Sequence, residues 1–152
     1  SGGERGGDIL ASYSNLSGVT VPASRAPSMI DEYPILSIAA ACASGKTIFE
    51  GVSELRVKES DRLATVSSGL NSCNIKVLET EDSLTINGVD EPEGGCKIPT
   101  NGDHRIAMAF LVLGMIAKKP ITVDDVSMIE TSFPKFLDIM ENIGGKFSRE
   151  KG

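Results

Sequence analysis

The segment ELRVKESDRL, residues 54–63, places six ionisable side chains within nine positions. If a helix begins near Lys58 or Glu59, its first turn presents Lys58 and Arg62 at i and i+4, with Glu59 beside them. A helix N-terminus adds free N–H groups and a partial positive charge, which favour a phosphate or carboxylate ligand. The alternative is a solvated helix face whose ion pairs each contribute about 0.3–0.5 kcal/mol.

A second candidate is NGDHRIAM, residues 101–108, which precedes a long apolar run. His104 is the only histidine, and it adjoins Arg105 at the expected start of a helix. Arginine offers a planar fork for carboxylate or phosphate, and histidine can donate, accept or titrate near neutral pH. The alternative is that Asp103 caps the helix and the two basic residues are merely polar neighbours.

Two further segments combine polar residues with helix starts. In SMIDEYP, residues 28–34, Asp31 and Glu32 precede an apolar helix, where acidic residues are common caps. A catalytic base there would need a partner that holds it against a substrate. In ETSFPKF, residues 130–136, a Thr or Ser cap followed by proline in the first turn indicates capping more than catalysis.

The familiar short motifs of nucleotide and metal enzymes are absent from the sequence. It contains no GxxxxGK[ST], GxGxxG, HExxH or GxSxG pattern. ASGKT, residues 43–47, lacks the first glycine of a P-loop and lies between a helix and a strand, which is the wrong order.

The elements that must position these residues follow from hydrophobic periodicity. We expect strands and helices in an order that occurs twice, the second time incompletely. The expected strands are 18–22, 46–51, 75–80, 83–88, 121–125 and 146–148, and the expected helices are 31–43, 59–73, 103–117 and 132–143. Residues 87–102 are expected to form a loop.

This order predicts a layered α/β (α+β) body built from βαβαββ units. The run IAMAFLVLGMIA, residues 106–117, is apolar nearly all round, which indicates a helix enclosed by other elements. We expect residues 1–17 to end a preceding unit, 18–90 to form one unit and 91–152 to form a second, partial one, all within one domain.

Composition sets further bounds on the protein. With 152 residues, 40% of them hydrophobic and 24% charged, the chain can bury roughly 70% of its unfolded surface. The net charge of −6 and the lack of a long basic block argue against a nucleic-acid partner. The apolar run at residues 107–117 is too short for a membrane span, and we expect neither a membrane segment nor a signal peptide.

Three cysteines at unrelated spacings suggest neither a disulfide framework nor a metal clip, and we therefore expect a cytoplasmic protein. The opening SGGERGGDIL has no initiator methionine and reads like part of a longer protein.

Taken in this order, IDEYPILSIAAA, ELRVKESDRL, DHRIAMAFLVLG and VDD…TSFPKF resemble the C-terminal part of the 5-enolpyruvylshikimate-3-phosphate synthase family. The resemblance runs from about Gly18 to Gly145. It implies a two-domain enzyme in which each domain is an inside-out α/β barrel of three βαβαββ units, the enolpyruvyl transferase fold, incomplete here. It also implies transfer of the enolpyruvyl group of phosphoenolpyruvate to the 5-hydroxyl of shikimate 3-phosphate, without metal or organic cofactor.

The resemblance assigns roles to individual residues. Asp31 matches the family's proton acceptor, which contacts the shikimate hydroxyls, and Glu59 matches the acid that protonates the methylene carbon of phosphoenolpyruvate. Addition–elimination on an enol ether requires both proton transfers.

The cationic residues match the family's substrate contacts. Lys58 matches a substrate-binding lysine, Arg62 and Arg105 match arginines that hold phosphoenolpyruvate, and His104 matches a neighbouring active-site histidine. Thr131 stands where many relatives have a lysine, so one expected phosphoenolpyruvate contact is missing from the pattern.

Two other functions remain open from the sequence. A UDP-N-acetylglucosamine enolpyruvyl transferase would share fold and chemistry, but that family lacks the KESDR passage. A non-catalytic module could use the charged segment to bind a phosphorylated partner. The resemblance further implies an N-terminal part of the same enzyme as partner, so the chain alone should be inactive, and an unpaired sheet edge would favour self-association.

Overall fold

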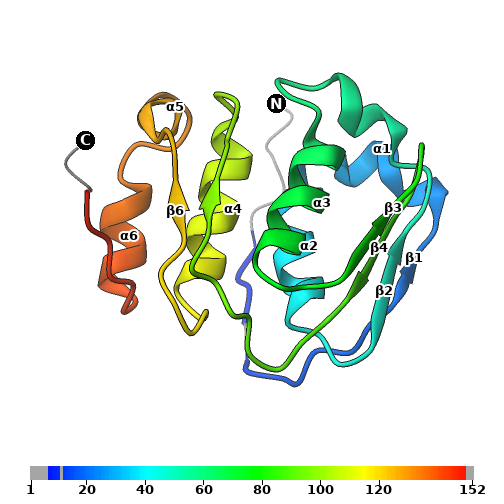
Figure 1. Ribbon diagram of the computed structural model, residues 1–152, viewed down its shortest axis with the longest axis horizontal. Helices are drawn as coiled ribbons and strands as arrows, with labels where there is room; N and C mark the ends of the chain where they lie inside the picture. Colours follow the sequence, from blue (N-terminus) through cyan, green and yellow to red (C-terminus); the bar gives the residue numbers. More distant parts are fainter. Residues whose placement is uncertain (1–6, 11, 150–152) are drawn as a thin grey trace.

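The computed structural model describes residues 7–10 and 12–149 and divides into two adjacent groups of elements (Figure 1). The first group contains a four-stranded sheet in the order β1-β2-β4-β3. Its strands are β1 Thr20–Val21, β2 Lys46–Phe49, β3 Val77–Glu79 and β4 Leu84–Asn87. β1 and β2 are parallel, whereas β4 runs antiparallel to both of its neighbours.

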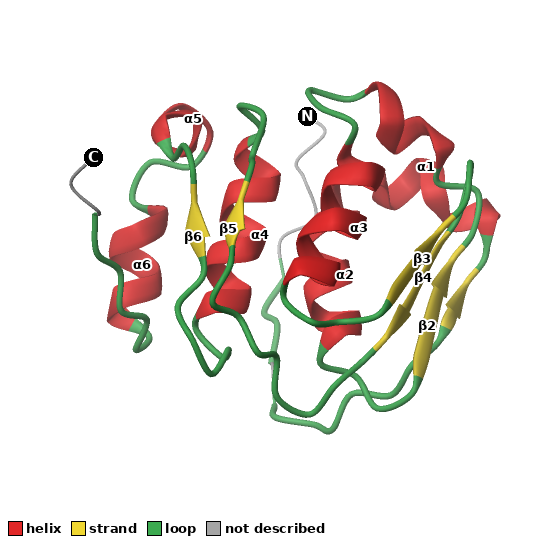
Figure 2. Ribbon diagram, viewed as in Figure 1, coloured by secondary structure: helices red, strands yellow, loops and turns green. Residues whose placement is uncertain are grey.

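Helices cover one face of this sheet (Figure 2). They are α1 Ala26–Met29, α2 Tyr33–Ala41 and α3 Arg62–Ser72, and each is preceded by a 3-10 segment, at Ala23–Arg25, Ile30–Glu32 and Ser53–Val57 respectively. Side chains alternate across the strands, so that Phe49, Leu84 and Ile86 are buried in the core while Leu78 on the edge strand is exposed.

The second group is organised around α4, His104–Gly114. It contains the parallel strands β5 Lys97–Ile98 and β6 Thr122–Val123 and the helices α5 Ser127–Ser132 and α6 Phe136–Asn142. Every residue of α4 is buried or partly buried, and α4 contacts α2, α3, α5 and β6. The prediction of an enclosed helix is therefore confirmed.

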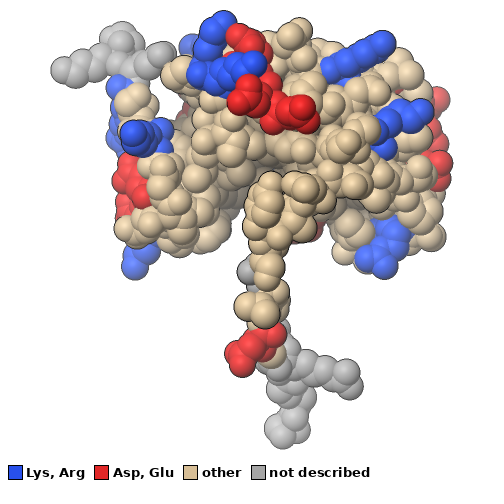
Figure 3. Space-filling model, turned by 90° about the horizontal axis from the view of Figure 1, so that it is seen from below, with Lys and Arg blue, Asp and Glu red and all other residues tan. Residues whose placement is uncertain are grey.

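Charged side chains are distributed without a broad basic area on the face that Figure 3 shows. Lys and Arg lie among Asp and Glu, mainly toward the rim of that face. Among the helices in the described part of the chain, none combines the length and apolar character that a bilayer span requires.

The expected start of the 59–73 helix near Lys58 or Glu59 is wrong. α3 begins at Arg62 because the carboxylate of Asp61 caps it, accepting a hydrogen bond from the backbone N–H of Ala64 at 2.9 Å. Lys58 has extended backbone angles and ends a 3-10 segment. Lys58 and Arg62 therefore do not share a helical turn. Asp31, which was also expected near a helix cap, lies in the 3-10 segment before α2 and does not cap α2.

The helix expected at 132–143 begins only at Phe136, as α6, and a separate helix, α5, ends at Ser132. Pro134 lacks an N–H and restricts the residue before it, and Phe133 accordingly leaves the helical region at φ −143° and ψ 74°. Lys135 then has a positive φ of 73° before α6 begins. Thr131 and Ser132 thus close α5 instead of capping a helix.

Two smaller expectations also differ from the structure. Residues 146–148 form no strand, because no strand in the described part of the chain pairs with them. Conversely, β5 lies within residues 87–102, which were expected to be only a loop. The other strands agree with the expected order but are shorter. The division into units at residues 17 and 90 stays a prediction.

Candidate active site

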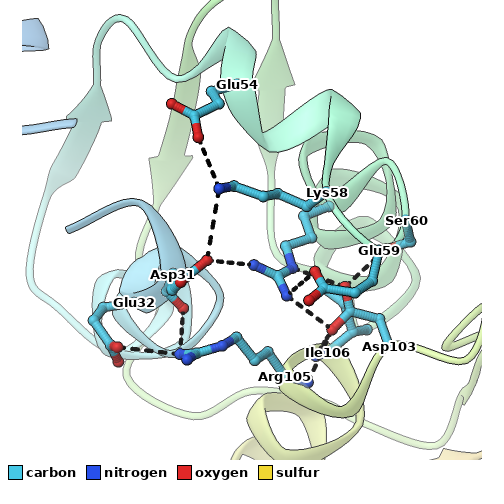
Figure 4. Close-up of polar contacts among 10 residues, drawn as sticks. Asp31, Glu32, Glu54, Lys58, Glu59, Ser60, Asp103, Arg105 and Ile106 are labelled. Atoms are coloured by element: carbon cyan, nitrogen blue, oxygen red, sulfur yellow. Dashed lines mark hydrogen bonds and ion pairs between the residues drawn. The ribbon is translucent and has the colours of Figure 1, made fainter. Parts of the chain in front are cut away.

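Arg62 is the centre of the polar network between α2, α3 and α4. Its side chain is fully buried, with 0% exposed. Nη1 donates to Asp31 Oδ1 at 2.9 Å, Nε donates to Asp103 Oδ2 at 2.7 Å, and Nη2 donates to Glu59 Oε2. Carboxylates from three separate segments therefore surround one guanidinium (Figure 4).

Asp103 joins the N-termini of α3 and α4 through one fully buried carboxylate. Its Oδ1 accepts from the backbone N–H groups of Arg105 at 2.9 Å and Ile106 at 3.4 Å, which caps α4. Its Oδ2 accepts from Arg62 and from the hydroxyl of Ser60 at 3.1 Å. The cap fixes the start of α4 against the start of α3.

The surroundings of Asp103 and Arg62 favour the ionised form of both side chains. Burial alone would raise the pKa of Asp103. The hydrogen bond and charge of Arg62, together with hydrogen bonds from the backbone N–H of Arg105 and the hydroxyl of Ser60, outweigh burial and lower that pKa. Burial alone would lower the pKa of Arg62, but Asp103, Glu59 and Asp31 together raise it. Each partner therefore keeps the other ionised although both are buried.

Three cations meet at Asp31. Its carboxylate accepts from Arg62 and lies 3.9 Å from Lys58 Nζ, while its backbone carbonyl accepts from Arg105 Nη1 at 2.8 Å (Figure 4). Arg62 and Arg105 come from the first turns of different helices, yet they contact the same residue.

Two of these cations have a second acidic partner. Lys58 Nζ lies 2.7 Å from Glu54 Oε1, and Arg105 Nη1 donates to Glu32 Oε1 at 3.1 Å. The side chains of these two glutamates are more than half exposed. An incoming anion can therefore compete with them for the cations.

The two predicted proton-transfer residues are not buried. The side chain of Asp31 is 48% exposed and that of Glu59 is 54% exposed. The buried acid of this network is Asp103, whose one cationic side-chain partner among the described residues is Arg62. Both candidate acids are thus held by Arg62 while remaining open to solvent and to a ligand.

The charged run at 54–63 divides into two groups. Arg56 turns away from the site and pairs with Asp61 at 3.1 Å and Glu79 at 2.8 Å, linking the segment to the β3–β4 hairpin. Arg56 therefore has a structural role in ion pairs, whereas Lys58, Glu59 and Arg62 lie in the polar network that contains Asp31. His104 is partly exposed at the start of α4, and its imidazole has no hydrogen bond among the described residues.

An open groove of about 180 Å³ begins at this network. Asp31, Glu32 and Arg105 line its charged end. The remainder is lined by Pro34, Ile35, Met108, Ala109, Val112, Phe133 and Phe136.

Neither this groove nor the link between Asp103 and Arg62 could be predicted from the spacing of residues in the sequence. The two linked residues, for example, are 41 positions apart. The only available signal was the cap position of Asp103.

Comparison with known proteins identifies the family. A family model described as EPSP synthase (3-phosphoshikimate 1-carboxyvinyltransferase) matches residues 5–140. The chain belongs to this family. The inferred resemblance to 5-enolpyruvylshikimate-3-phosphate synthase is therefore confirmed.

Relatives of EPSP synthase cover nearly all of the chain. Proteins named 3-phosphoshikimate 1-carboxyvinyltransferase from Caulobacter vibrioides and from Chelativorans sp. are 53% and 55% identical to it over 143 and 147 residues. The matches cover 93% and 95% of this chain but only 32% and 33% of the relatives. The chain thus spans about a third of the length of these curated relatives.

A solved EPSP synthase from Acinetobacter baumannii has the same fold over the matched region. The match has a TM-score of 0.85 at 38% identity and covers 90% of this chain and 32% of that one. The expected α/β fold of the enolpyruvyl transferases is thereby confirmed for the part that the chain contains.

Proposed function

We propose that this chain supplies the part of an enolpyruvyl transferase site that holds phosphoenolpyruvate and moves its protons. The full-length enzyme would transfer the enolpyruvyl group to the 5-hydroxyl of shikimate 3-phosphate and release phosphate. The observation that carries the proposal is the meeting of Lys58, Arg62 and Arg105 at Asp31. Family membership supports the reaction class.

The cations bind the anionic groups of phosphoenolpyruvate. Arg62 and Arg105 present guanidinium groups that suit a carboxylate or phosphate, and Lys58 adds a more mobile charge. Before substrate binds, Asp31, Glu32, Glu54 and Glu59 neutralise these three groups. A substrate anion exchanges with these half-exposed carboxylates, so the buried guanidinium of Arg62 is never left unpaired.

The two acids then handle the protons of addition and elimination. Asp31 accepts the proton of the attacking 5-hydroxyl as its oxygen bonds to carbon 2 of phosphoenolpyruvate, and Glu59 gives a proton to carbon 3. In elimination, Glu59 takes a proton back from carbon 3 while the carbon–oxygen bond to phosphate breaks, and Asp31 gives its proton to the released phosphate or to solvent.

Replacing Glu59 tests the catalytic role. In a full-length family member whose matching third is replaced by this chain, we expect Glu59→Gln to lower kcat by about 10²–10⁴-fold while phosphoenolpyruvate still binds. The amide keeps the size of the side chain but cannot deliver the proton. Steady-state release of phosphate measures kcat, and calorimetry measures binding.

Glu141→Gln is the matched control, because Glu141 is exposed on α6, far along the chain from the network. It should leave kcat within about twofold of the unsubstituted enzyme. Unchanged turnover in Glu59→Gln would refute the catalytic role and favour a non-catalytic anion-binding module. Thermal stabilisation by UDP-N-acetylglucosamine, and not by shikimate 3-phosphate, would instead favour the related sugar-nucleotide transferase.

A further inference from the structure

Two cysteines lie in contact at the C-terminal end of α3, the end opposite to Arg62 and the candidate active site. Cys73 follows the last residue of α3, and Cys96 immediately precedes β5. Their Sγ atoms are 2.8 Å apart. A disulfide bond is about 2.05 Å long, so the sulfur atoms would need to move by less than about 1 Å to form one.

The backbone on each side holds this contact in place. The N–H of Cys73 donates to the carbonyls of Gly69 at 3.2 Å and Leu70 at 3.1 Å, which closes the last turn of α3. The carbonyl of Cys96 accepts from the N–H of Thr122 at 3.0 Å, at the start of the β5–β6 pair. The two thiols therefore approach each other from well-anchored segments.

The loop before Cys96 is held equally closely. Gly94 forms an isolated bridge with Lys119, and a Cβ added to Gly94 would lie 2.1 Å from the carbonyl oxygen of Lys119. Gly95 donates from its N–H to the carbonyl of Pro120 at 3.0 Å. This close approach leaves the backbone little freedom to carry Cys96 away from Cys73.

The two thiols differ in access. Cys73 is fully buried, whereas Cys96 is partly exposed. The third cysteine, Cys42, follows α2 and makes no sulfur contact among the described residues. A small reagent can therefore reach Cys96 directly, and Cys73 is positioned to react with whatever Cys96 has bound.

We propose that Cys73 and Cys96 form a thiol–disulfide pair that reacts with low-molecular-weight disulfides such as oxidised glutathione. The pair would cross-link the C-terminal end of α3 to the strand that leads into α4. The inference does not depend on the proposed function.

The reaction consists of two exchanges. The Cys96 thiolate attacks one sulfur of oxidised glutathione, the disulfide bond of the reagent breaks, and one glutathione leaves as thiolate. Cys73 then releases its proton to solvent and attacks Cys96 Sγ, displacing the second glutathione. Two protein thiols are oxidised by two electrons, and one glutathione disulfide is reduced to two thiols.

The second exchange is the slower one. Burial, followed by the hydrogen bond with Cys96, raises the pKa of Cys73 to about 12, so little of its thiolate is present near neutral pH. Binding of glutathione to Cys96 removes the thiol on that side and brings the target sulfur into contact. We therefore expect a transient mixed disulfide at Cys96 before the internal bond forms.

Mass spectrometry of the chain incubated with reduced and oxidised glutathione tests the proposal. The expected product is lighter by about 2 Da and yields a proteolytic peptide that joins Cys73 to Cys96. Because the cross-link closes a loop of about two dozen residues, the oxidised chain should also melt roughly 5–12 °C higher. Reduction with dithiothreitol should reverse both changes.

Two variants make the outcome decisive. Cys42→Ser should behave like the unsubstituted chain, whereas Cys96→Ser should lose both the cross-link and the rise in Tm. Cys96→Ser is preferred to a change at Cys73 because a hydroxyl at the fully buried position could prevent folding. A folded chain whose Cys73 stays reduced, whose Cys96 keeps its glutathione, or whose main product links Cys42 would overturn the proposal.

Discussion

Asp103 performs two structural tasks with one carboxylate. It caps α4 through backbone N–H groups and it holds the buried guanidinium of Arg62 at the start of α3. Arg62 in turn holds both candidate proton-transfer residues, Asp31 and Glu59. Asp103 touches neither of these acids, so it acts on the site by fixing Arg62.

The lowered pKa of Asp103 predicts acid sensitivity. A carboxyl group whose folded-state pKa lies below its unfolded value stabilises the fold fully above the unfolded value, about 3.9, and loses this contribution as the pH falls through the folded value. We expect the free energy of unfolding to fall below about pH 4. Asp103→Asn should remove about 3 kcal/mol at pH 7 and flatten the acid decline. Urea unfolding between pH 2.5 and 7 measures both.

Asp138→Asn is the control, because Asp138 is exposed in the first turn of α6. It should change the free energy of unfolding by less than about 0.5 kcal/mol and leave the acid decline in place. Asp124 also has a lowered pKa, since its hydrogen bonds with Thr100 outweigh the effect of burial, so part of the decline should survive in Asp103→Asn. An acid decline as steep in Asp103→Asn as in the unsubstituted chain would contradict this account.

Close packing brings the helices α3 and α4 together. Gly69 on α3 faces Phe110 on α4, and a Cβ added to Gly69 would lie 2.3 Å from the Cζ atom of that ring. Phe110 is fully buried, so in a close-packed interior its ring can move only if its neighbours move too. Because Arg62 and Arg105 begin these two helices, the distance between the helices also sets the distance between the cations.

A methyl group at Gly69 should therefore destabilise the protein. Gly69→Ala gains about 1 kcal/mol of helix propensity, but overpacking against Phe110 costs about 1–3 kcal/mol or more. We expect a net loss of up to about 2 kcal/mol in urea unfolding. Ser68→Ala, at the exposed neighbouring position, should be neutral or slightly stabilising. Phe110→Leu combined with Gly69→Ala should be less destabilised than the sum of the two single changes.

Periodicity was sufficient to predict most elements but not their ends. The β3–β4 hairpin and the enclosed helix α4 follow from alternation and from a continuous apolar run. The start of α3 depends on which polar residue caps it, and several adjacent candidates precede Arg62. Pro134 sits where a first helical turn tolerates proline, so its role as a break between α5 and α6 was not evident from the sequence.

The chemistry of the site was predictable by residue type, but its assembly was not. Resemblance to the family pointed to Asp31, Glu59, Arg62 and Arg105, and the structure brings these residues together. Contacts across 31 and 74 positions of sequence depend on tertiary packing, which local patterns do not encode. The catalytic and binding roles of these residues stay predictions.

At the scale of the whole molecule, the open groove links the charged network to the surface. Two of its apolar lining residues are well exposed, Ile35 at 39% and Phe133 at 43%. Apolar surface of this kind, beside a charged site, is typical of an interface or a ligand groove. Since the chain spans about a third of its curated relatives' length, the groove is a candidate contact for the remaining two thirds of such an enzyme.

Complementation tests this contact directly. We expect the chain alone to release no phosphate from phosphoenolpyruvate and shikimate 3-phosphate, and turnover to appear when it is mixed with the separately produced remaining two thirds of a family member. Ile35→Asp should raise the chain concentration needed for half-maximal activity by about tenfold or more, because a carboxylate buried in an apolar contact costs more than about 1.4 kcal/mol. Leu78→Asp, a change of the same kind at a 62% exposed position on β3, should leave that concentration unchanged. Robust turnover by the chain alone, or equal effects of the two substitutions, would show that the groove is not the contact that completes the enzyme.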